Sequence, residues 1–182
     1  WPDLEKIAQL AGCRNQALFI ERYIRIDDQI LREEFKEFDS ISIMDEEYPE
    51  ELLWMHNPHV LLFYEGNIDL LKHPKIAVVG SRRCSRTGIH SVEKIINELN
   101  NELVVVSGLA KGIDAASHYA AIRNGGKTIG VIGTGLDVYY PRCNKQLQKH
   151  MSERYLVLTE YGPGQGPQKH HFPERNRIIA GL

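Results

Sequence analysis

From residue 75 onward, short apolar runs alternate with longer stretches in which apolar residues recur at helical spacing. Each run leads into a loop that contains glycine, and the runs occupy residues 76–79, 103–106, 128–132 and 155–159. Helices are predicted between and after them, over residues 87–99, up to residue 124, over residues 144–150 and from about residue 173. Continuous apolar strands separated by amphipathic helices indicate a parallel sheet covered on both faces. The pattern therefore predicts a doubly wound, Rossmann-like α/β fold with a mainly parallel sheet.

The beginning of the chain follows a helical pattern instead. Ile7 and Leu10 share one face of a first helix, and Gly12 stands where a C-cap glycine would end it. Further helices are predicted over residues 15–23 and 27–38. Three short helices suggest a small helical bundle, or the end of one, before the α/β part of the chain.

The stretch between these two parts, residues 39–74, mixes acidic residues with prolines. It contains an apolar run from Val60 to Tyr64, bounded by Pro58 and Gly66, which predicts a buried strand.

We therefore divide the chain into the end of a helical domain at residues 1–39 and an α/β domain at residues 40–182. Both are expected to be incomplete in this sequence, because the chain starts abruptly within the helical pattern and stops within the last predicted helix. The two tryptophans, Trp1 and Trp54, are expected to pack in the interior.

Charge is divided unevenly between the two halves of the chain. The overall formal charge is −2, but residues 1–74 carry a net −9 and residues 75–182 a net +7. A basic second half favours an anionic partner such as nucleic acid. The alternative is a chance asymmetry of charge on a solvated surface. Basic residues placed directly after the strand ends would argue against that alternative.

Membrane insertion and export find no support in the sequence. No apolar stretch approaches the roughly 18 residues that a spanning helix needs, and the first residues lack a basic segment followed by an apolar one. Cys13, Cys84 and Cys143 are far apart and form no C-x-x-C pair, which argues against a disulfide framework or a zinc site. A reducing cytoplasm is the expected location.

The loops that follow the predicted strands hold most of the polar groups that could bind a ligand or take part in a reaction. Ligands of such sheets bind outside the carboxyl ends of the strands, near helix N-termini. Exposed backbone amides together with converging Arg and Lys side chains form an anion site, and phosphate is its natural occupant. The candidate site residues are Gly80, Ser81, Arg82, Lys111, Arg142, Lys169, Arg175 and Arg177.

Several enzyme classes lack their signature. There is no G-x-x-x-x-G-K-[ST] phosphate loop, no G-x-G-x-x-G dinucleotide fingerprint and no G-x-S-x-G nucleophile elbow. His170 and His171 are adjacent in a loop and favour packing or phosphate contact over metal binding. Asp114 stands in the first turn of a helix, where a carboxylate complements the dipole. No acid–base pair is evident, so we expect neither an enzyme nor a cofactor or metal.

Four segments together resemble the DprA/Smf family of DNA-processing proteins. Three of them read IAVVGSR at residues 76–82, VSGLAKGID at 106–114 and PERNRII at 173–179. The fourth runs from Tyr48-Pro49 to LLFYEGN at residues 61–67. The resemblance spans about residues 40–182 and is greatest to streptococcal members, while the helical beginning is similar to the end of that family's sterile-alpha-motif-like domain.

This resemblance implies an extended Rossmann-like domain that binds single-stranded DNA, forms a homodimer and loads RecA recombinase onto incoming DNA during natural transformation. It implies DNA contacts for Arg82, Arg142 and Lys169 and for both arginines of the R-N-R motif, and more weakly for Lys111. The dimer and recombinase surfaces are expected beyond Leu182. Four aromatic residues near the basic loops either stack on bases or anchor the loops: Tyr139, Tyr140, Tyr161 and Phe172.

Two other functions are open on the residues alone. A Rossmann-like enzyme that binds nucleotides or hydrolyses their N-glycosidic bond would share glycine-rich, arginine-bearing loops, but its P-G-G-x-G-T pattern is missing here. A structural scaffold that binds a protein through the acidic helices would show no phosphate affinity.

Overall fold

A computed structural model describes residues 4–10, 12, 15, 17, 37–99 and 101–182. The first helix, α1 (Leu4–Leu10), is confirmed, and Gly12 ends it with a φ of +64° and a hydrogen bond of 3.0 Å from its N–H to the Gln9 carbonyl. The helices expected over residues 15–23 and 27–38, like Trp1, lie almost wholly outside the described residues. The division into domains at residue 39 stays a prediction.

A six-stranded sheet forms the centre of the described chain, in the order β1-β2-β6-β5-β4-β3. Strands β3 to β6 are parallel to one another, whereas β2 runs antiparallel to both β1 and β6. The expected mainly parallel α/β sheet is confirmed. The strands are β1 (Asp39–Ser42), β2 (Leu61–Gly66), β3 (Lys75–Ala77), β4 (Val104–Ser107), β5 (Thr128–Val131) and β6 (Leu156–Thr159).

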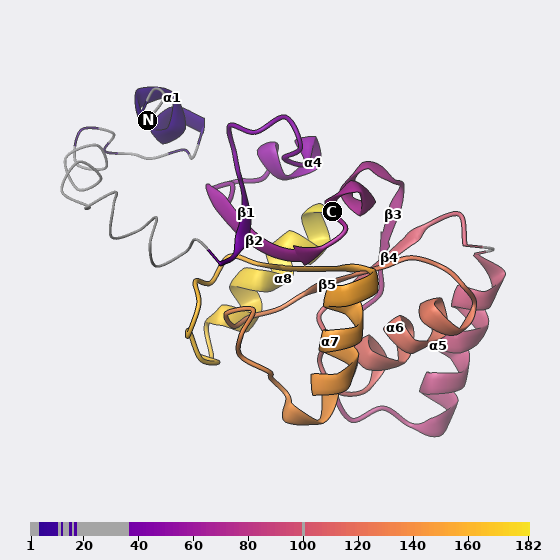
Figure 1. The fold of residues 1–182 in the computed structure, drawn as a ribbon. Helices are drawn as coiled ribbons and strands as arrows, with labels where there is room; N and C mark the ends of the chain where they lie inside the picture. Colours follow the sequence, from indigo (N-terminus) through magenta and orange to yellow (C-terminus); the bar gives the residue numbers. More distant parts are fainter. Residues whose placement is uncertain (1–3, 11, 13–14, 16, 18–36, 100) are drawn as a thin grey trace.

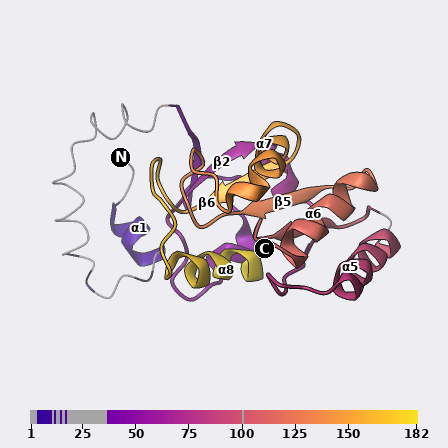
Figure 2. The ribbon, with the colours of Figure 1, turned by 90° about the horizontal axis from the view of Figure 1, so that it is seen from below.

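Helices cover both faces of this sheet (Figure 1). One face carries α4 (Glu50–Leu53), the 3-10 helix η1 (Ile68–Lys72) and α8 (His171–Gly181). The other carries α5 (Arg86–Glu98), α6 (Ile113–Arg123) and α7 (Lys145–Arg154), and a short 3-10 turn, η2 (Arg142–Asn144), precedes α7. Figure 2 shows α7, α6 and α5 following one another across their face of the sheet. None of the helices among the described residues has the length and apolar character needed to cross a lipid bilayer.

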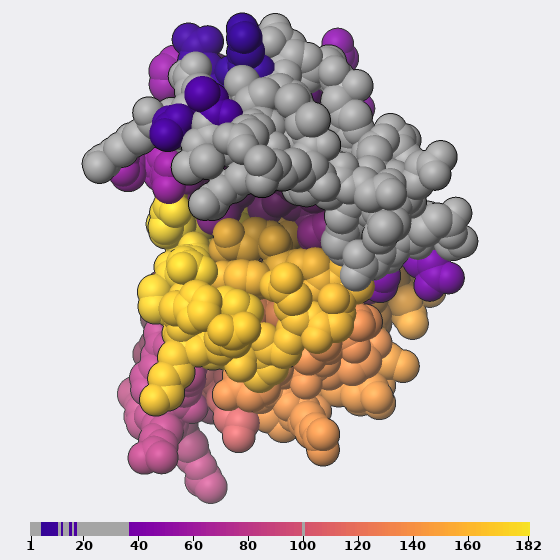
Figure 3. Space-filling view, turned by 90° about the vertical axis from the view of Figure 1, so that its left-hand side faces the viewer, coloured from indigo at the N-terminus to yellow at the C-terminus, as the bar shows by residue number. Residues whose placement is uncertain are grey.

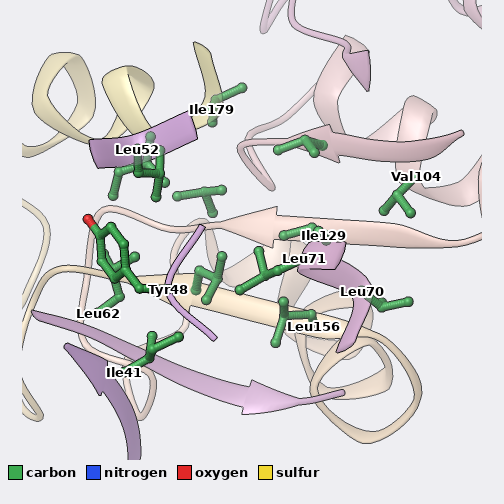
Figure 4. Close-up of a cluster of buried hydrophobic side chains, with 14 of the residues drawn as sticks. Ile41, Tyr48, Leu52, Leu62, Leu70, Leu71, Val104, Ile129, Leu156 and Ile179 are labelled. Carbon is green, nitrogen blue, oxygen red and sulfur yellow. The ribbon is translucent and has the colours of Figure 1, made fainter. Parts of the chain in front are cut away.

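The parallel strands contribute side chains to the cores on both faces of the sheet. In β4, Val104 and Val106 point into the core beneath α4 and α8, while Val105 packs against Ile96 of α5 and Ala120 of α6. This alternation follows from the two-residue period of a strand. Figure 4 shows the larger core, where residues from β1, β2, η1 and α4 meet those of the parallel strands.

The stretch before β3 differs most from expectation. The strand predicted at residues 60–64 is confirmed as β2, but β1 and α4 were not predicted, since neither carries a regular apolar pattern. Strand β3 is less buried than a doubly covered strand should be, because it forms an edge of the described sheet. Val79, which follows it, is 59% exposed. The expectation for Trp54 is wrong: it is 82% exposed, directly after the last residue of α4.

Residues 39–74 form one unit with the parallel sheet. The fully buried Leu52 of α4 lies in the same cluster as Ile178 and Ile179 of α8, and β1 and β2 extend the sheet itself. Residues 39–74 therefore belong to the α/β unit, and the ion pair between Glu51 and Lys75, at 3.1 Å, adds to the apolar contacts that hold this acidic segment.

Replacing Leu52 by Ala should test this packing. We expect the free energy of unfolding to fall by about 2–5 kcal/mol, because the substitution leaves a cavity between α4 and α8. The neighbouring Leu53 is 36% exposed, and Leu53→Ala should cost less than about 1 kcal/mol. Urea denaturation measures both, and equal losses would show that α4 is not a packed part of the fold.

Candidate functional site

The loops after the four parallel strands meet at one edge of the sheet. Parallel strands end at the same edge, so the segments 78–85, 108–112, 132–144 and 160–170 all lie there. Helices α5, α6 and α8 begin at this edge as well. In the space-filling view the C-terminal residues, in yellow, border the orange surface of the loop before α7 and the magenta surface of the segment near residue 85 (Figure 3).

A cavity of about 240 Å³ opens between these loops. Its exposed cations, Arg82 and Lys111, come from the loops after β3 and β4 and form no ion pair with any described residue. Unpaired cations facing one cavity attract an anion. The lining residues are Arg82, Arg83, Gly108, Ala110, Lys111, Gly133, Tyr140, Pro141, Phe172 and Arg175.

Two helix starts add partial positive charge to this edge. Ser85 caps α5 by accepting a hydrogen bond of 3.1 Å from the Gly88 N–H, and α6 begins directly after Gly112. Gly112 has a φ of +80°, and a Cβ there would lie 2.2 Å from the Ser81 carbonyl oxygen. Only glycine therefore allows the loops after β3 and β4 to touch, which brings Arg82 and Lys111 to the same cavity.

The backbone of the 108–112 loop is strained and firmly held. Leu109 has a φ of +52°, a conformation that costs a leucine roughly 1–2 kcal/mol. Its side chain is 1% exposed and packs on Gly130. The Asn144 side chain donates hydrogen bonds of 2.8 and 3.1 Å to the carbonyls of Leu109 and Ala110. The loop after β5 thus fixes the shape of the loop after β4.

Arg175 lines the cavity but is almost entirely buried. Its side chain is 3% exposed, and its guanidinium donates to the carbonyl oxygens of Gly108, at 2.6 Å, and of Val131. Burial lowers the pKa of Arg175 to about 10, while the charge of Asp114 raises it, so the side chain is protonated at neutral pH. A Cβ at Gly108 would lie 2.6 Å from this guanidinium. Arg175 therefore acts as a tie between the ends of β4 and β5.

Asp114 and His118 lie buried on α6, within electrostatic reach of Arg175. Burial raises the pKa of Asp114, and the charge of Arg175 and the Gly80 N–H, 3.4 Å from its Oδ1, partly oppose this. The carboxylate thus holds the β3 loop at the start of α6. The structural role that the sequence suggested for Asp114 agrees with this geometry.

His118 makes one side-chain hydrogen bond within the described chain, and the donors and acceptors around it indicate which ring nitrogen carries the proton. The Thr128 hydroxyl donates to the Val105 carbonyl at 2.8 Å, so at 2.6 Å it accepts from His118 Nδ1–H. The Nε2 atom is buried without a partner. Burial, with a further contribution from the charge of Arg175, lowers the pKa of His118 to about 3, and the imidazole is neutral in the folded protein at pH 7.

The aromatic residues near the site divide into two groups. Tyr140 and Phe172 line the cavity with their ring centroids 5.6 Å apart, and the Arg82 guanidinium lies 5.1 Å from the Phe172 ring. Tyr161 is buried and stacked on His171 at 3.8 Å, and its hydroxyl donates to the His171 carbonyl. Tyr161 therefore anchors a loop, while Tyr140 and Phe172 offer faces to a ligand.

Of the remaining predicted site residues, Arg142, Lys169 and Arg177 do not line the cavity. Arg142 is exposed in η2 next to the cavity residue Pro141, and Lys169 is exposed in the loop before α8. Arg177 points elsewhere, because its guanidinium donates to the carbonyls of His56 and Asn57. Two residues apart on a helix, Arg175 and Arg177 lie on different faces, so the R-N-R motif does not act as one cluster.

One lining cation was not among the predicted site residues. Arg83 follows Arg82 directly and is exposed at the cavity, and the pair of arginines after Gly80-Ser81 was the signal that could have identified it.

Within the described part of the chain, no group of three or more His, Cys, Asp and Glu residues could hold a metal ion. The site is thus built for binding an anion beside an apolar, aromatic wall.

Comparison with known proteins agrees with this architecture. Residues 39–182 match the sequence model of the DNA recombination-mediator protein A family. The chain belongs to this family. The match begins at β1, an edge strand of the described sheet.

Relatives of the family share both sequence and fold with the chain. It is 63% identical over 98% of its length to the DNA processing protein DprA of Streptococcus pneumoniae, of which it covers 64%, and 44% identical over 79% to that of Bacillus subtilis, of which it covers 49%. The X-ray structure of the S. pneumoniae protein superimposes with a TM-score of 0.87, covering 98% of this chain and 63% of that one. A structure of the Helicobacter pylori protein, described for its single-stranded DNA binding mode, has 28% identity and a TM-score of 0.71, covering 79% of this chain and 66% of that one.

Substitution of Arg175 should separate its structural role from ligand contact. We expect Arg175→Gln to lower the free energy of unfolding by about 3 kcal/mol, since it removes charged hydrogen bonds to two buried carbonyls. Arg82→Gln, which removes an exposed cation, should change it by less than about 0.5 kcal/mol. Equal, small effects in thermal and urea unfolding would contradict the proposed tie between β4 and β5.

His118 should make stability depend on pH. The unfolded imidazole titrates near its ordinary pKa of 6.5 and the folded one near 3, so the contribution of His118 is complete above pH 6.5 and is lost as pH falls toward 3. The stability advantage of the wild type over His118→Asn should shrink by about 1.4 kcal/mol per pH unit below 6.5. Urea unfolding from pH 7.5 to 4.5 measures it, and a constant difference would contradict a buried neutral imidazole.

Proposed function

We propose that this chain binds single-stranded DNA at the cavity beyond the carboxyl ends of β3, β4 and β5, without strong sequence preference. The observation that carries the proposal is the set of unpaired cations, Arg82, Arg83 and Lys111, facing a cavity beside two helix N-termini and an aromatic wall. Guanidinium groups and helix N-termini bind phosphates. The single-stranded DNA binding mode described for the H. pylori relative supports the same ligand class.

The lining of the cavity, whose volume is about 240 Å³, supports a preference for single strands. Phe172 and Tyr140 can stack on a base only when that base is unpaired. Stacking serves all four bases, and the cavity's cations contact phosphate, so little sequence discrimination is expected.

The predicted site residues take different roles in this proposal. Arg82, Lys111, Arg142 and Lys169 contact phosphates, and Gly80 and Ser81 place Arg82 on the loop that touches the start of α6. Arg175 lines the cavity, but its main role is to position the two loops, since its guanidinium is bonded to the carbonyls of Gly108 and Val131. Arg177 holds the 56–57 segment and is left out of the interface.

Family membership supports a wider role. We propose that the protein acts in the cytoplasm as a homodimer, in competence and homologous recombination, and loads RecA recombinase onto single-stranded DNA during natural transformation. A binding role without catalysis fits a site that offers cations and aromatic faces. The chain covers less than two thirds of the S. pneumoniae relative, and the dimer and recombinase surfaces are assigned to no residue here.

Fluorescence anisotropy with labelled oligo-dT, over a range of salt concentrations, tests the proposed site. We expect tight binding that weakens steeply with salt. Affinity should fall by about 10-fold or more for Arg82→Glu and for Lys169→Glu, because each replaces a phosphate-binding cation by a repulsive charge. Lys127→Glu is the matched control, since this exposed lysine precedes β5 at the opposite edge of the sheet.

Three results would contradict the proposal: no binding, binding indifferent to Arg82 and Lys169, or an equal loss for Lys127→Glu. The first would direct attention to small nucleotides as ligands. The last would mean that net charge alone governs affinity.

A further inference from the structure

Positive charge is concentrated at the beginning of α7. Lys145 is the first residue of α7, there is no acidic residue in that first turn, and Arg142 precedes it in η2. A helix N-terminus favours negative charge, so a lysine there is unfavourable. Lys149 follows one turn later, and like charges four residues apart on a helix repel. The helix dipole and the repulsion between the two lysines thus both oppose this arrangement, and a polyanion lying against it would relieve both.

Tyr139 holds the two lysines on one side of the helix. The Lys145 and Lys149 ammonium groups lie 4.8 and 5.7 Å from the centre of the Tyr139 ring. Both lysines are exposed, so each can keep its contact with the ring while facing a ligand. We call Tyr139, Lys145 and Lys149 the α7 strip.

No carboxylate of the described chain neutralises this strip. Some exposed cations elsewhere on the described chain do have a carboxylate partner: Lys72 pairs with Asp69, Lys94 with Glu98 and Arg123 with Glu93. Lys145 and Lys149 form no ion pair with a described residue, and this includes Glu153, one turn beyond Lys149.

The strip is continuous with the cavity. Tyr140 and Pro141, which directly follow Tyr139, line the cavity. Asn144, the residue before Lys145, donates its two hydrogen bonds to the 109–110 backbone at the cavity rim. A strand leaving the cavity past Pro141 meets Arg142 first and then the strip, where Lys145 and Lys149 are about 6 Å apart along the helix axis.

We propose that the α7 strip is a second phosphate-binding surface, which holds the backbone of single-stranded DNA where it extends out of the cavity. This inference rests on the proposed function and adds the direction in which the strand leaves. The strip binds phosphates only, so it increases affinity for long strands and leaves very short ones unaffected.

The salt dependence of binding reports how many phosphates the protein neutralises. Removing one lysine that binds a phosphate of a single strand reduces the magnitude of the slope of log K against log salt by about 0.7. A Lys145→Gln/Lys149→Gln variant should therefore reduce that magnitude for dT20 by about 1.4, and the affinity at 0.1 M salt by roughly 10- to 30-fold. Binding of dT4, which occupies the cavity alone, should change less than about twofold.

The experiment compares full-length wild type, the strip variant and a Lys72→Gln/Lys127→Gln control with the same change of net charge at the opposite edge of the sheet. Anisotropy of dT20 and calorimetry of dT4 give the affinities, and thermal unfolding checks that each variant folds. Acetylation of lysines followed by mass spectrometry, with and without dT20, reports directly on Lys145 and Lys149.

The inference holds if only the strip variant shows the reduced slope and if dT20, but not dT4, protects Lys145 and Lys149 from acetylation. It is overturned, with the proposed function intact, if the strip variant binds dT20 like the wild type while Arg82→Glu does not. That result would leave an acidic protein as the ligand of the strip. It is overturned together with the proposed function if the wild type binds neither oligonucleotide.

Discussion

The buried guanidinium of Arg175 is the constraint around which the site is arranged. A positive charge inside a protein is costly unless its hydrogen bonds are satisfied. Here the carbonyl oxygens of Gly108 and Val131 accept them, and Asp114 lies within electrostatic reach. Since these carbonyls follow or end β4 and β5, the same contacts that stabilise the charge fix the loops that carry Lys111 and Tyr140. Gly108 must be glycine because the guanidinium occupies the space of its Cβ.

Exposed positive charge surrounds this buried guanidinium. The exposed cations Arg82 and Lys111 form no ion pair with a described residue, and the starts of α5 and α6 add to the positive potential. The strained backbone at Leu109 and the short approach at Gly112 indicate a loop held in a set shape rather than one that adapts. A preformed site of this kind spends little free energy on ordering when a flexible strand binds.

Much of the fold could be predicted because strand and helix patterns are local. The runs ending near residues 79, 106, 132 and 159 correspond to β3, β4, β5 and β6, and the helices between them agree within a few residues except α7, which extends to Arg154. Strand β1 escaped prediction because only Ile41 of its four residues is buried. The exposed Trp54 was missed for the opposite reason, since residue type alone suggested burial.

The fold class and the family could be established from the amino-acid sequence, and the edge of the sheet at which the candidate site lies could be predicted from it, because each depends on patterns within a few residues and on the shared direction of parallel strands. What each basic residue does depends instead on the folded chain. Arg175 and Arg177 stand in one motif, yet one ties β4 to β5 and the other holds the 56–57 segment. Whether a guanidinium meets solvent or a carbonyl depends on residues 44 to 121 positions away in the chain, and no local pattern carries that information.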